Sequence, residues 1–74
     1  MTIVCILGWN PGFKKVEFNW LLRDSSDLSL SERKIKVDLI LKGEPVYVDV
    51  VPDLLSKFLE RALVLGAICQ VKDG

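Results

Sequence analysis

Three short runs of β-type residues, separated by stretches with helical spacing, limit the topologies open to this chain. The runs are residues 2–7, 46–50 and 67–72. The helical stretch between the second and third runs predicts a right-handed crossover between parallel strands, and the first run is apolar on both faces, as in a central strand. We therefore predict a two-layer α+β fold in the order β-α-α-β-α-β. Its antiparallel or mixed three-stranded sheet has the strand order 2-1-3, with three helices on one face.

Local signals mark where these elements begin and end. The Pro-Gly pair at residues 11–12 suits a type II turn after the first strand. Residues 29–32 match a capping box, which predicts the start of the second helix, and Gly43 suits its left-handed C-terminal cap. Pro52 fits the first turn of the third helix, which Gly66 ends.

The stretch of residues 13–23 has helical spacing but carries two apolar groups on opposite sides. One group consists of Phe18, Leu21 and Leu22, and the other of Phe13, Val16 and Trp20. This helix is amphipathic only if one group lies outside the core. Either the second group is an exposed docking surface, or Trp9 and Phe13 cover Val16 and Trp20 in a second small core.

The second helix also has apolar residues on two sides. We expect Leu30, Val37, Ile40 and Leu41 in a buried stripe, with Ile35 and Leu39 round the other side. The six basic residues between positions 14 and 36 are interspersed with four acidic ones. That mixture is typical of a solvated face rather than a nucleic-acid site.

Length and composition exclude several classes of function. A chain of 74 residues is one domain, covering residues 1–74, and half of them are hydrophobic, which is ample for a core. Ten Lys and Arg balance ten Asp and Glu, so no long-range field attracts nucleic acid or an anionic membrane. Histidine, a glycine-rich phosphate loop and a nucleophile elbow are all missing from the sequence. We therefore predict no metal, no cofactor and no enzymatic activity.

Cys5 and Cys69 fall on strands predicted to be neighbours. A disulfide would need their Cα atoms within about 7 Å. The apolar run at residues 2–8 is too short for a signal peptide or a membrane span. We therefore expect a cytoplasmic protein with two reduced, buried thiols.

The first two predicted helices carry a pattern that resembles a known family, and the resemblance covers nearly the whole chain. Its residues are Lys15, Val16, Arg23, Leu28, Leu30, Glu32 and Lys34. They resemble the Lys-Val-x-x-x-Lys-x-Val-Arg and Leu-x-Leu-x-Glu-Ala-Lys segments of the C-terminal domain of the bacterial ribosomal stalk protein. In that family the exposed face of the two helices docks translation factors. The resemblance implies a partner-binding face at Lys15, Val16, Asn19, Trp20, Arg23, Leu30 and Lys34.

The chain also departs from the stalk pattern. Trp20 stands in place of a lysine, Asn19 in place of an aliphatic residue and Arg33 in place of an alanine. Asp27 and Ser29 replace glycines of the helix link. Because the stalk protein's flexible dimerisation arm has no counterpart in this sequence, we expect a stand-alone relative of the stalk domain.

These observations favour a protein-binding module. We expect one that binds and masks a specific partner protein through the first two helices, as an immunity protein masks a toxin. The alternative is a translation-associated module that docks a translation factor. We also consider a weak homodimer formed through the bare face of the sheet, where the run of residues 3–7 is apolar on both sides.

Overall fold

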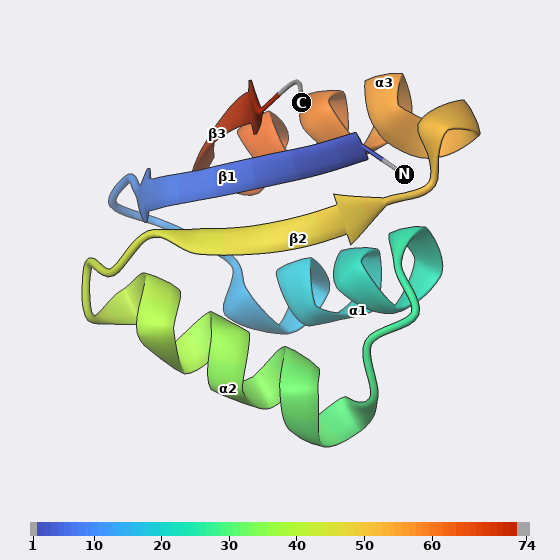
Figure 1. Ribbon diagram of the computed structural model, residues 1–74. Helices are drawn as coiled ribbons and strands as arrows, with labels where there is room; N and C mark the ends of the chain where they lie inside the picture. Colours follow the sequence, from blue (N-terminus) through green and yellow to red (C-terminus); the bar gives the residue numbers. More distant parts are fainter. Residues whose placement is uncertain (1, 73–74) are drawn as a thin grey trace.

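The computed structural model describes residues 2–72 and confirms the predicted α+β architecture (Figure 1). Its elements are β1 (Thr2–Trp9), α1 (Lys15–Ser25), α2 (Leu30–Leu41), β2 (Val46–Val50), the 3-10 helix η1 (Pro52–Leu54), α3 (Leu55–Val64) and β3 (Ala67–Lys72). β1 pairs antiparallel with both other strands, so the sheet has the predicted order β2-β1-β3. The helices pack on one face of this sheet.

The core lies between sheet and helices because alternate residues of each strand point to that side. Val4 opposes Val48, Ile6 opposes Val46, and all four are buried. The helices cover them with Phe18 and Leu22 of α1, Val37 and Ile40 of α2, and Phe58 and Ala62 of α3. Burying one such large side chain stabilises the fold by about 1.5–3 kcal/mol. The net free energy of unfolding of a domain is only about 0.05–0.15 kcal/mol per residue. One such side chain therefore accounts for a large share of the stability of a chain of 74 residues.

The connection from β1 to α1 contains the predicted type II turn. The Phe13 N–H donates to the Asn10 carbonyl at 3.1 Å, and Gly12 has a φ of 90°. The Lys14 N–H donates to the Leu65 carbonyl at 3.0 Å. These two bonds hold the chain in the turn, and α1 therefore begins two residues later than the spacing predicts.

β1 is longer than predicted, because it continues past Leu7 to Trp9. Trp9 pairs with Ala67 of β3, and the Asn10 N–H donates to the Gly66 carbonyl at 2.8 Å. The pairing shifts register after Ile6, so the strand reaches Trp9 through an irregularity of the bulge type. Pairing with β3 thus keeps Gly8 and Trp9 in an extended conformation, although their own sequence predicts a break in the strand.

The predicted caps of α2 are present. The Glu32 N–H donates to Ser29 Oγ at 3.2 Å, and the Ser29 N–H donates to Glu32 Oε1 at 3.1 Å. Gly43 after α2 and Gly66 after α3 have φ values of 83° and 95°, in the left-handed region that favours glycine. Pro52 begins a short 3-10 turn that leads into α3.

The predicted buried stripe of α2 is correct toward its C-terminus and wrong at its first turn. Val37 and Ile40 are buried, whereas Leu30 is 64% exposed. Leu39, expected round the other side, packs against the core. The first turn of α2 lies farther from the sheet than the last turn (Figure 1). Helical spacing shows which residues share a face, but not how far the neighbouring elements extend along it.

We expect Gly66→Ala to destabilise the protein more than Gly43→Ala. Both positions have a positive φ, which costs a residue with a Cβ roughly 1 kcal/mol. A Cβ at position 66 would also lie 3.1 Å from the Phe13 Cα, whereas position 43 faces open space. Urea unfolding midpoints measure the difference. Equal losses for the two variants would contradict the close approach of the two turns.

Glu32 should make part of the stability depend on pH. The backbone hydrogen bond from Ser29, and then the Ser29 side chain, lower the pKa of Glu32 below its usual 4.5. As the pH falls below 4.5 the unfolded chain takes up the proton first, so this contribution is lost as the pH falls through the folded-state pKa. The stability advantage of wild type over Glu32→Ala, from urea unfolding at a series of pH values, should therefore shrink in acid.

Glu32→Gln is the matched control for this effect. Glutamine can accept the same backbone hydrogen bond but does not titrate. Its advantage over Glu32→Ala should stay constant over the same pH range. A wild-type advantage that is equally constant would show that the Glu32 carboxylate is not held by the cap.

Candidate functional site

A groove runs between α1 and α2 on the helix side of the molecule. Its volume is about 320 Å³. It is lined by Lys15, Val16, Asn19, Trp20, Leu30, Lys34, Val37 and Asp38. We call this the helix groove. It brings together six of the seven residues expected to bind a partner, all except Arg23. Val37 and Asp38, which the sequence did not suggest, follow Lys34 by three and four positions and so share its face of α2.

The apolar side chains of the helix groove are open to solvent. Val16 and Trp20 of α1 are 50% and 53% exposed, and Leu30 of α2 lies across from them. Phe18 and Leu22 occupy the opposite side of α1 and are fully buried. The two apolar groups of α1 therefore have different roles, one in the core and one at the surface.

The alternative of a second small core over Val16 and Trp20 is wrong. Trp9 packs against Phe13 with ring centroids 6.3 Å apart, and Phe13 packs against Phe18 at 5.4 Å. Phe13 therefore joins the main core, although its helical position placed it with Val16 and Trp20. Among residues 2–72, the close ring pairs do not include Trp20.

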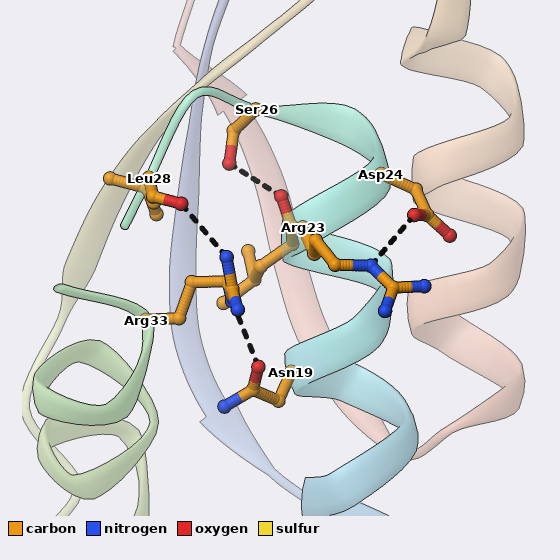
Figure 2. A network of polar contacts seen from close by, with 7 residues as sticks. Asn19, Arg23, Asp24, Ser26, Leu28 and Arg33 are labelled. Atoms are coloured by element: carbon orange, nitrogen blue, oxygen red, sulfur yellow. Dashed lines mark hydrogen bonds and ion pairs between the residues drawn. The ribbon is translucent and has the colours of Figure 1, made fainter. Parts of the chain in front are cut away.

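Asn19 and Arg33 join the two helices at the end of the groove. The Arg33 Nε donates to Asn19 Oδ1 at 2.9 Å, and the Arg33 Nη1 donates to the Leu28 carbonyl, also at 2.9 Å (Figure 2). One guanidinium thus connects α1, the link and α2. Both residues are departures from the stalk pattern, and the structure shows that the two departures are partners. The side-chain amide oxygen of Asn19 therefore already accepts a hydrogen bond from Arg33, and this bond links α1 to α2.

Arg33 is the residue of this region that the sequence reasoning missed. The sequence marks it as a substitution for alanine but indicates no role for it. The available signal was a second polar substitution, at Asn19, on the facing helix. Without the packing of α1 on α2, nothing connects two positions 14 residues apart.

Arg23 lies outside the helix groove. Its Nε donates to Asp24 Oδ1 at 3.1 Å, and both side chains are exposed (Figure 2). An exposed ion pair of this kind contributes about 0–1 kcal/mol. The structure thus separates Arg23 from the other six expected residues.

The charges of the groove are mostly positive. Lys15 comes from α1 and Lys34 from α2, and Asp38 is the one acidic residue in the lining. Within residues 2–72 the only ion pair is the one between Arg23 and Asp24, so the two lysines of the groove are free of carboxylate partners. Glu32, which also matches the stalk pattern, is engaged in the capping box.

The two cysteines are free thiols on opposite faces of the sheet. Cys69 pairs beside Ile6, whose side chain points into the core, whereas Cys5 is the next residue along β1 and points the other way. Neighbouring strands that present their thiols to opposite faces do not place them for a disulfide. Burial raises the pKa of the Cys69 thiol to about 11, which keeps it protonated and weakly nucleophilic at neutral pH.

A larger hollow, of about 520 Å³, lies between α1 and α3. Its lining is Leu21, Asp24, Ser25, Leu54, Lys57, Glu60, Arg61 and Val64. Charges of both signs alternate there, and no exposed aromatic residue lines it, so we consider the helix groove the better candidate despite its smaller volume. Residues 2–72 contain no group of three or more side chains that could hold a metal ion.

None of the helices formed by the described residues is long and apolar enough to cross a membrane. No protein-family model and no curated protein matches this chain.

Proposed function

We propose that this protein is a non-enzymatic binding module that recognises a partner protein through the helix groove. The observation that carries the proposal is the exposure of Trp20, Val16 and Leu30 around one hollow, with a lysine on each helix beside it. Exposed apolar groups that gather around a hollow are typical of interaction sites. Tryptophan in particular is enriched among residues that dominate binding energies.

The chemistry of the groove defines what would fit it. An apolar side chain of the partner can enter between Trp20 and Leu30 and remove both from water. Carboxylates on either side of that side chain would meet Lys15 and Lys34, which have no competing ion pairs within the described residues. A partner segment with an apolar anchor flanked by acidic residues therefore complements the groove in both shape and charge.

Within this proposal, masking of a specific partner in the cytoplasm is our first choice. The groove differs from the stalk pattern, since Trp20 in its lining replaces a lysine and the Asn19–Arg33 contact at its end replaces two apolar residues. A rebuilt contact surface supports a dedicated partner, such as a toxin held by its immunity protein.

Docking of a translation factor is the second candidate. It is favoured by Val16, Leu30 and Lys34, which match the stalk pattern and all line the groove. The two candidates differ in affinity. A dedicated inhibitor should bind at about nanomolar Kd, close to 12 kcal/mol, whereas a recruiting module binds more weakly and releases quickly.

Replacing Trp20 should remove partner binding and leave the fold intact. We expect affinity capture from native lysate to recover one stoichiometric partner with the wild-type protein and to lose it with Trp20→Ala. Calorimetry with that partner should show a loss of about 30-fold or more, because a central tryptophan typically contributes about 2 kcal/mol. The identity and affinity of the partner then distinguish masking from translation-factor docking.

Leucines on two helices provide a matched control for this experiment. Leu30 lines the groove, and Leu63 on α3 is similarly exposed, at 71%, but lies outside it. Leu30→Ala should weaken binding and Leu63→Ala should not, with the same unfolding midpoint for all variants. Equal capture by wild type and Trp20→Ala, or an equal effect of the two leucine variants, would rule out the groove as the binding site.

A further inference from the structure

The face of the sheet that points away from the helices is apolar in the middle and charged at two edges. Cross-strand pairing arranges its residues in rows. Ile3 of β1 opposes Asp49 of β2 on one side and Lys72 of β3 on the other. One row across the sheet therefore reads acid, aliphatic, base.

The remaining rows of this face are largely uncharged. In the next row Cys5 lies between Tyr47 and Gln70, and beyond the register shift Gly8 opposes Ile68 beside Leu7. The large apolar side chains of this face, Ile3, Leu7, Tyr47 and Ile68, are each about half exposed. A sheet face that meets only water normally carries polar residues at such positions. This face therefore has the composition of a contact surface.

Asp49 and Lys72 do not form an ion pair with each other within one molecule. β1 lies between their strands, so they are separated by two strand spacings, about 10 Å. Neither forms an ion pair with another of the described residues. The face thus presents a positive and a negative group at the same level along β1 but on opposite edges.

We propose that this face binds a second copy of the chain, related by a two-fold axis parallel to β1. A half turn about such an axis lays β3 of the second copy over β2, and keeps every residue at its own level along the strands. Asp49 then faces Lys72 of the second copy, Lys72 faces Asp49 of the second copy, and Ile3 meets Ile3. The charge pattern is therefore self-complementary in this orientation.

The other in-plane orientation lacks this match. A two-fold axis perpendicular to the strands would lay each edge strand over its own copy, so that Asp49 would reach the far end of the facing β2 and Lys72 the end of the facing β3 that holds Ile68. Neither charge would then face the opposite charge, so this orientation gains no ion pair across the interface. The charges thus select one dimer, and the zero net charge of the chain adds no repulsion between copies.

The size of the face indicates a weak association. Three strands of about six residues make a face of about 15 Å by 20 Å. That is less than the roughly 800 Å² per partner of a standard interface. We therefore expect a dissociation constant in the micromolar range, so that the protein is monomeric when dilute and dimeric when concentrated.

Charge reversal tests both the dimer and its orientation. Sedimentation equilibrium from about 1 μM to about 1 mM would measure the dissociation constant of wild type, Asp49→Lys, Lys72→Asp and the double variant. Each single reversal creates two like-charge contacts per dimer and should weaken association at least about tenfold. The double reversal recreates both ion pairs in swapped form and should return the constant to within about threefold of wild type.

Asp53→Lys and Lys57→Asp are the matched controls, because both residues are exposed on the helix side of the molecule. They should leave association unchanged, and circular dichroism should confirm that every variant is folded. A wild-type monomer at about 1 mM would overturn the proposal. So would association that resists the single reversals, or a double variant no better than the singles.

Discussion

Every strand pairing in this protein depends on β1. It is the central strand, so β2 and β3 both form their inter-strand hydrogen bonds with it. Its Val4 and Ile6 are fully buried in the core. The helices between β1 and β2 and those between β2 and β3 all pack on one side of this sheet. In so small a domain, that single layer of contacts supplies nearly all of the apolar burial that offsets the cost of ordering the chain.

Helix α1 carries apolar residues on two opposite sides, but only one side can face the sheet. Its Phe18 and Leu22 must face the sheet, which leaves Val16 and Trp20 turned toward water. The Asn19–Arg33 contact holds α2 beside α1 without covering those two residues, so the fold keeps an apolar hollow open. An exposed tryptophan contributes little to folding, and the hollow around it is the property on which the proposed binding function rests.

The two proposed contact surfaces lie on opposite layers of the molecule. The helix groove belongs to α1 and α2, and the apolar rows belong to the far face of the sheet. A dimer joined through the sheet would leave both grooves open, so one dimer could hold two partner molecules or two sites on one partner. Linked binding of that kind strengthens attachment without any new contact at the groove.

Local chemistry in the sequence determined much of the fold. The Asn10-to-Phe13 turn, the capping box at Ser29 and the glycine caps depend on neighbouring residues alone, and they were predicted where the structure has them. The strand order followed from connection rules. The groove residues came from the stalk resemblance, and the structure does assemble most of them around one hollow.

Only the tertiary structure decided what each face meets. It extended β1 to Trp9 through pairing with β3, moved Phe13 into the core, and left Leu30 exposed at the first turn of α2, which lies farther from the sheet than the last turn. It also joined Asn19 to Arg33. Periodicity gives the direction in which a side chain points from its own element. Whether that direction ends in water, in the core or at a hydrogen-bond partner depends on elements far away in the sequence.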